Sequence, residues 1–140
     1  LALSFIGSKA PEALLEAADC DVAEVRVAAI SALGDQIQKG DNLRAQNRVF
    51  QALEDVSADV RAEAVTLIGK SCDAEDVETL LLKKLSDEDT QVRKNTALSL
   101  MKLDAIGSIQ YLKMAEQKED DPDVKAVIRV AINILSAKNG

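Results

Sequence analysis

The segment Asp59–Gly69 reads DVRAEAVTLIG, and its Val-Arg pair recurs at a regular interval along the 140-residue chain. The four copies are Val25-Arg26, Val60-Arg61, Val92-Arg93 and Val124-Lys125. Successive valines, here called anchor valines, are 35, 32 and 32 residues apart. A period of this length is typical of solenoids, in which each repeat buries its apolar face only by stacking on its neighbours. The sequence therefore predicts four copies of one supersecondary unit.

Small or aliphatic residues follow each anchor valine at offsets of four, seven and eight positions. In a helix of 3.6 residues per turn these offsets share one face with the anchor, so that face must be buried. The predicted core positions are Ala29, Ala32, Leu33, Ala64, Leu67, Ile68, Thr96, Ser99, Leu100, Ile128, Ala131 and Ile132. Each anchor valine is thus expected near the start of a helix, called helix B.

Acidic residues precede each anchor valine, and a second apolar stretch precedes the acidic residues. Asp121 followed by Pro122 is typical of a helix start, because proline at the first helical position loses no hydrogen bond. Each repeat is therefore predicted to contain helix A, an acidic turn and helix B. In the last repeat, helix A is expected to use Ile109, Leu112, Met114 and Ala115 as its apolar residues.

These patterns predict one domain over residues 1–140. It comprises a partial repeat at 1–8 and full repeats at about 9–40, 41–71, 72–104 and 105–138. The partial repeat is inferred because Phe5-Ile6-Gly7 matches the Leu-Gly end of helix B, so residue 1 is expected to lie inside an earlier helix B. The natural protein is accordingly expected to extend further at its N-terminal side. Gly34 and Gly69 are expected to loosen or end their helices.

Composition excludes several classes of function. Acidic residues outnumber basic ones, 24 to 17, and a net charge of −7 disfavours binding to nucleic acid. No apolar run approaches the roughly 18 residues needed to cross a membrane. Cys20 and Cys72 fit neither a CxxC motif nor a disulfide framework, so we expect two free thiols in a reducing, cytoplasmic compartment.

Catalytic and ligand-binding motifs are not found. The chain contains no histidine, which excludes His-based acid–base chemistry and His-ligated metals. Cys20 and Cys72 therefore lack a histidine that could activate them. The isolated Gly7, Gly34 and Gly69 form no phosphate-binding loop. The sequence thus predicts no catalytic residue, no metal ligand and no cofactor, and hence a chain that is not an enzyme.

The acidic turn, the Val-Arg pair, the spaced alanines and the Leu-Ile-Gly ending of residues 59–69 resemble the HEAT-repeat superfamily. The resemblance is strongest to the short HEAT-like repeats of the phycobilisome-lyase type. It implies an all-α fold, a right-handed α-α superhelix of about four helix pairs plus a partial N-terminal helix, with helices B on the concave side. Thr96 and Ser99, where alanines are typical, and Lys125, where arginine is typical, depart from the pattern. Because the superfamily serves many purposes, the resemblance alone implies no single function.

One cation follows each anchor valine, which gives two alternatives for the row Arg26, Arg61, Arg93 and Lys125. Each cation either pairs with a carboxylate of its own or a neighbouring turn, tying the repeats together, or binds acidic groups on a partner. The acidic turns likewise either stabilise helix N-termini or bind a basic partner.

Offsets of two and five after the anchor valines are expected to face the concave side. The first two repeats would then present the apolar residues Val27, Ile30, Ala62 and Val65, and the last two would present Lys94, Ala97, Ala126 and Arg129. An apolar patch next to charges is typical of a docking surface.

The sequence therefore favours a non-catalytic scaffold module of a larger prokaryotic protein, which binds another protein or another domain of its parent chain. Two alternatives stay open. The resemblance to phycobilisome lyases implies a lyase-associated subunit that acts on the bilin chromophores of phycobiliproteins. A regulatory domain fused to a redox or signalling protein is the other.

Overall fold

The computed structural model describes residues 11–38 and 43–139. Over these ranges the regular elements are all helical and no β-strand is found, which confirms the all-α prediction. None of the helices there has the length and hydropathy required to span a bilayer. The partial repeat predicted for residues 1–8 lies outside the described residues. The chain divides into two compact units, unit 1 (Leu1–Ser71) and unit 2 (Cys72–Gly140).

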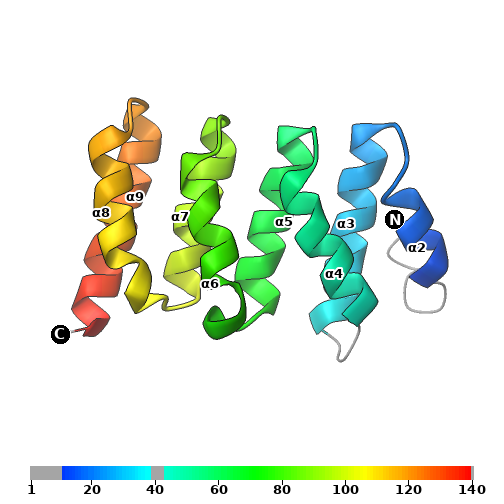
Figure 1. The fold of residues 1–140 in the computed structure, drawn as a ribbon, viewed down its shortest axis with the longest axis horizontal. Coiled ribbons are helices and arrows are strands. Elements are labelled where there is room, and N and C mark those ends of the chain that lie inside the picture. Colours follow the sequence, from blue (N-terminus) through cyan, green and yellow to red (C-terminus); the bar gives the residue numbers. More distant parts are fainter. Residues whose placement is uncertain (1–10, 39–42, 140) are drawn as a thin grey trace. The chain divides into compact units, whose positions relative to one another are not determined.

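Unit 1 contains two successive helix pairs. Its elements are α2 (Pro11–Ala17), α3 (Ala23–Gln38), α4 (Leu43–Gln51), the 3-10 turn η1 (Ala52–Glu54) and α5 (Ala58–Ser71). Each helix A packs on its own helix B, α2 on α3 and α4 with η1 on α5. The two helices B, α3 and α5, also pack side by side (Figure 1).

Unit 2 repeats this arrangement. Its elements are α6 (Ala74–Leu82), the 3-10 turn η2 (Lys83–Ser86), α7 (Thr90–Lys102), the 3-10 turn η3 (Ile106–Ser108), α8 (Ile109–Lys118) and α9 (Pro122–Asn139). Here α6 and η2 pack on α7, α8 packs on α9, and α7 packs against α9. Each of the four full repeats expected from the sequence thus contains one helix pair. The superhelix with its handedness and concave face stays a prediction.

The predicted apolar face of helix B forms the core of both units. All of the anchor, +4, +7 and +8 positions are buried except Val25, which is partly exposed. Thr96 departs from the alanine pattern but is also buried, because its hydroxyl donates a hydrogen bond of 2.7 Å to the Val92 carbonyl one turn earlier. Asp89 and Asp121 cap α7 and α9, each accepting two backbone N–H groups of the first turn.

Gly34 has a packing role rather than a helix-ending one. Gly34 is expected from the sequence to loosen or end its helix, and the second alternative is wrong, because α3 continues four residues beyond it, to Gln38. A Cβ added to Gly34 would lie 2.6 Å from Cδ2 of Leu67 on α5. Glycine at this position therefore allows the backbones of α3 and α5 to approach closely.

Candidate functional site

Three arginines of helices B, namely Arg26, Arg61 and Arg93, donate hydrogen bonds to the turn that precedes their own helix. In unit 1, Nη1 of Arg26 donates to the carbonyls of Cys20 at 2.9 Å and Asp21 at 3.1 Å, in its own turn. Nε and Nη2 donate to the two carboxylate oxygens of Asp55 at 3.0 and 2.9 Å. Because Asp55 belongs to the turn of the next repeat, one guanidinium fixes two turns at once.

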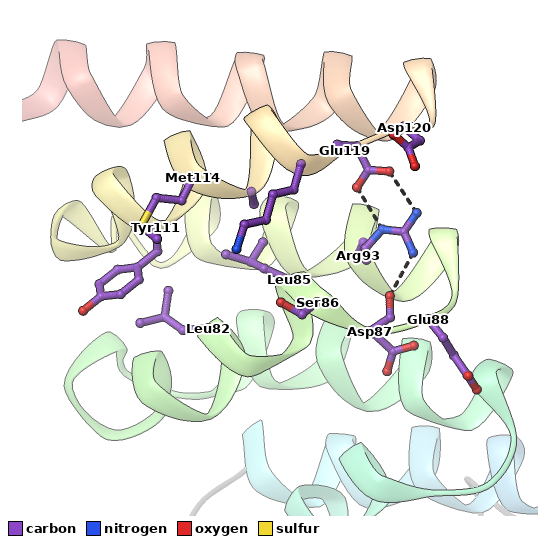
Figure 2. Close-up of a pocket in the computed structure, with 12 residues that line it drawn as sticks. Leu82, Leu85, Ser86, Asp87, Glu88, Arg93, Tyr111, Met114, Glu119 and Asp120 are labelled. Carbon is purple, nitrogen blue, oxygen red and sulfur yellow. Dashed lines mark hydrogen bonds and ion pairs between the residues drawn. The ribbon is translucent and has the colours of Figure 1, made fainter.

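Arg93 makes the same arrangement in unit 2 (Figure 2). Its Nη1 donates to the Asp87 carbonyl at 2.8 Å, and its Nε and Nη2 donate to the Glu119 carboxylate at 2.8 and 2.9 Å. The side chains of Arg93 and Glu119 are only 17% and 4% exposed. We call the pairs Arg26–Asp55 and Arg93–Glu119 the arginine clasps. Two parallel charge-assisted bonds give such pairs both strength and a fixed orientation.

The clasp carboxylates are held in their ionised form. Hydrogen bonds from Arg93 lower the pKa of Glu119, although burial alone would raise it. Burial alone would also raise the pKa of Asp55, but hydrogen bonds from Arg26 and from the Ser57 amide outweigh it, so this pKa is lowered too. For Arg26 and Arg93 the structure therefore favours the alternative in which the cations tie repeats together.

The other two cations of the predicted row differ from the clasps and from each other. Arg61 is only 8% exposed, and its Nη1 donates to the carbonyls of Asp55 at 2.8 Å and Val56 at 3.3 Å. Lys125 is exposed at the start of α9. The four positions therefore do not present a uniform row of accessible charges to a partner.

The predicted concave patch is wrong for its two main apolar residues, because Ile30 and Val65 have no exposed surface. Ile30 lies one turn before Gly34, on the flank of α3 that meets α5. In α3, offset five thus lies at the contact with the neighbouring helix B and not on an open face. Among the other predicted residues, Val27 and Lys94 are partly exposed, and Arg129 is exposed and paired with Glu116 of α8.

The structure adds a feature that the sequence analysis missed, a surface groove of about 470 Å³ in unit 2. It runs between α6 with η2 on one side and α8 on the other (Figure 2). Its apolar lining comprises Leu82, Leu85, Tyr111, Met114 and Ala115. Its polar lining includes the Arg93–Glu119 clasp, Asp87, Glu88, Lys118 and Asp120.

Met114 and Tyr111 occupy the groove because of their register on α8. Leu112 is the buried residue of this helix, whereas Met114 is 54% and Tyr111 44% exposed. The expectation that Met114 belongs to the apolar core of helix A is therefore wrong. A tyrosine three residues before a methionine, in a chain with one tyrosine and two methionines, is the signal that could have revealed an exposed apolar stripe.

The described residues offer little to metals or to nucleophilic chemistry. No group of three or more His, Cys, Asp or Glu side chains is placed to hold a metal ion among residues 11–38 and 43–139. Cys20 and Cys72 are free thiols. Burial raises the pKa of Cys72, and the carboxylates of Asp76 and Asp73 raise it further, which disfavours the reactive thiolate.

A family model for HEAT repeats matches residues 47–133, which is more than half of the chain. The chain belongs to the HEAT-repeat family. It is also similar to the bilin biosynthesis protein MpeU of Synechococcus sp. (strain WH8020), with 46% identity over 135 residues. The matched region is 96% of this chain and 46% of that protein, so the chain spans about half the length of this curated relative.

This relative overturns the prediction that the chain is not an enzyme, since its name assigns it to the biosynthesis of bilins. The prediction depended on missing histidines and unactivated thiols. Such absences exclude particular catalytic groups, but an enzyme also accelerates a reaction by binding and orienting its substrate.

Proposed function

We propose that this HEAT-repeat chain is part of a protein that attaches a bilin to a phycobiliprotein subunit or detaches it. The observation that carries the proposal is the 46% identity with the bilin biosynthesis protein MpeU along 96% of the chain. The matched region includes all four helix pairs, so the similarity is not limited to one repeat.

The described side chains support a positioning role within that reaction. The thiol of Cys72 is held protonated, and the arginines of the clasps are saturated by carboxylates and carbonyls. We therefore assign to this region the task of holding the bilin and the acceptor subunit in a reactive arrangement. Fixing two reactants in this way removes much of the entropic barrier of their reaction.

The protein partner under this proposal is a phycobiliprotein subunit. Of the residues expected from the sequence to contact a partner, the cations Lys94, Lys125 and Arg129 retain exposed surface in unit 2, and the apolar Val27 does so in unit 1. We propose these residues as contacts for that subunit, because exposed ammonium and guanidinium groups guide association with acidic surfaces.

The experiment combines a chromophore-free phycobiliprotein subunit with free bilin, with and without the 140-residue chain. Visible absorbance follows the environment of the bilin, and fluorescence of the subunit on a denaturing gel shows whether the bilin has become covalently bound. We expect the chain to change the rate or the yield of attachment. Identical time courses with native chain, with heat-denatured chain and with no chain would contradict the proposal.

A further inference from the structure

The groove of unit 2 has two chemically different ends (Figure 2). Leu82, Tyr111 and Met114 line one end, where the tyrosine ring and the methionine side chain stand out from α8. The other end holds Arg93, clasped by Glu119, with Asp120 beside them. A ligand that fills the groove must therefore combine an extended apolar body with polar groups.

One stripe of α8 connects the two ends. Tyr111, Met114 and Lys118 lie three and four residues apart, so they follow one another along the same face of the helix. Lys118 is exposed, and no ion pair between it and another described residue is found. Its ammonium differs in this respect from the Arg93 guanidinium, which Glu119 and the Asp87 carbonyl already saturate.

We propose that this groove is the bilin-binding site of the chain, with a pyrrole ring against Tyr111 and Met114 and a propionate on the ammonium of Lys118. This assignment rests on the function proposed above and names the place on the chain where the bilin is held.

The chemistry of a linear tetrapyrrole matches the groove at three points. Its conjugated rings present π-faces, which stack on a tyrosine ring and contact a thioether favourably. Its propionates are carboxylates, which an ammonium binds through charge-assisted hydrogen bonds. Its pyrrole N–H groups are donors, for which the carboxylate of Asp120 is an acceptor at the polar end. A volume of about 470 Å³ lies within the usual range for small-molecule sites.

A basic amphipathic helix of a protein partner is the competing occupant, because acidic residues gather at one end of the groove. Two observations favour the bilin. Glu119 is neutralised by Arg93, so the acidic end carries less charge than its composition indicates. Lys118 stands at the boundary between the apolar wall and the acidic end, where it would repel the cations of such a helix.

The test titrates the 140-residue chain with biliverdin and follows bilin absorbance together with tyrosine fluorescence. Tyr111 is the single tyrosine of a chain without tryptophan, so the ultraviolet emission comes from the groove itself. We expect saturable quenching in the wild type. Met114→Glu should weaken binding about tenfold or more, because it places a carboxylate against an apolar ring. The matched control is Val130→Glu on α9, at a similarly exposed position outside the groove, which should change the affinity less than about twofold.

The role of Lys118 is tested by changing the ligand as well as the protein. Biliverdin dimethyl ester lacks both carboxylates, so the wild type should bind it about tenfold more weakly than biliverdin. Lys118→Ala should remove most of this difference. Lys113→Ala, on the same helix but outside the groove, should keep the full difference.

The outcomes separate the site from the function. Equal affinities of wild type, Met114→Glu and Lys118→Ala would overturn the groove assignment and leave the proposed function standing. The same holds if the chain alters chromophore attachment but does not bind biliverdin by itself. If Met114→Glu abolishes binding of the bilin-free phycobiliprotein subunit and leaves biliverdin affinity unchanged, the groove is a protein-docking site and the assignment fails. Failure of both bilin binding and the attachment assay would overturn both proposals.

Discussion

In unit 1 an arginine bridges the two helices A, whereas in unit 2 the corresponding residue lines an open groove. Arg48 of α4 stands immediately before the buried Val49. Its Nη2 donates to the Ala18 carbonyl at 2.7 Å and to the Asp19 carboxylate at 3.1 Å, and its side chain is 14% exposed. The guanidinium therefore fills the space between α4 and the end of α2.

The residue immediately before the buried Leu112 of α8 is Tyr111, which is 44% exposed. Tyrosine carries no charge, so it cannot form such a bridge. A carboxylate partner is also missing, because the position that Asp19 occupies before the turn in unit 1 is occupied in unit 2 by Ser86. The comparison shows that two repeats with the same backbone plan and the same clasp acquire different surfaces through side-chain exchanges at one helix face.

The largest expected effect tests the feature that the units share. Arg93→Met should destabilise unit 2 by about 2–3 kcal/mol, because Glu119 would stay buried without its charged partner. Chemical denaturation followed by circular dichroism measures the loss. Arg129→Met is the control, since its ion pair with Glu116 involves a side chain that is 62% exposed and should contribute less than about 0.5 kcal/mol.

Replacing both clasp residues sharpens the test. The double variant Arg93→Met, Glu119→Leu should be more stable than Arg93→Met alone, because no unpaired charge remains buried. Arg26→Met should shift unit 1 in the same direction as Arg93→Met shifts unit 2. Equal stabilities of Arg93→Met and Arg129→Met would show that the clasp does not hold the turns together.

The helices and their buried faces could be predicted from the sequence because they depend on a local rule. A period of 3.6 residues determines which offsets share a face, whatever lies opposite. Even the departure at Thr96 obeys that rule, since its hydroxyl finds an acceptor within its own helix.

The groove, the burial of Ile30 and the choice among clasp partners could not be predicted in this way. Which flank of a helix B meets its neighbour depends on crossing geometry, and in unit 1 this geometry is set by Gly34 against Leu67. The partners Arg26 and Asp55 are 29 residues apart, and several other carboxylates stand in the same turns. A sequence pattern offers such alternatives but does not choose between them.

The contact between neighbouring helices B is a second difference between the two units. Gly34 of α3 corresponds to Met101 of α7, nine residues after each anchor valine, and Met101 is partly exposed. Gly34→Ala should destabilise unit 1 by about 1–2 kcal/mol, because the added Cβ overlaps Leu67. Met101→Ala should cost less in unit 2, because part of that side chain already contacts water.

Removing the overlap should change the effect of Gly34→Ala on stability from destabilising to stabilising. In a Leu67→Ala background, Gly34→Ala should stabilise the protein by up to about 1 kcal/mol, which is the helix propensity of alanine over glycine. Thermal unfolding of the four members of this cycle measures the coupling. A Gly34→Ala variant that is destabilised equally in both backgrounds would contradict the close contact of α3 and α5.

Exchanging the bridging residue tests the difference at the helices A directly. Arg48→Tyr should destabilise unit 1 by about 1 kcal/mol, since one carbonyl bond and one exposed ion pair are lost. Denaturation measures the change, and Arg44→Tyr is the control, because its pair with Glu12 is about two-thirds exposed on both sides. An Arg48→Tyr variant as stable as Arg44→Tyr would show that the bridge is not what closes unit 1.

The smallest expected effect concerns acid, and it separates the two clasps. The pKa of Glu119 and that of Asp55 are lowered in the folded chain, so each carboxylate contributes stability that is complete above its unfolded pKa, about 4.3 for Glu and 3.9 for Asp. That contribution is lost as the pH falls through the lowered folded values. Glu119→Gln should therefore flatten the fall in stability below about pH 4.5 in unit 2, while unit 1 keeps its dependence through Asp55. Denaturation at a series of pH values measures the slope of stability against pH in the wild type and in Glu119→Gln. Equal slopes in the two proteins would exclude Glu119 of the Arg93–Glu119 clasp as the group that titrates.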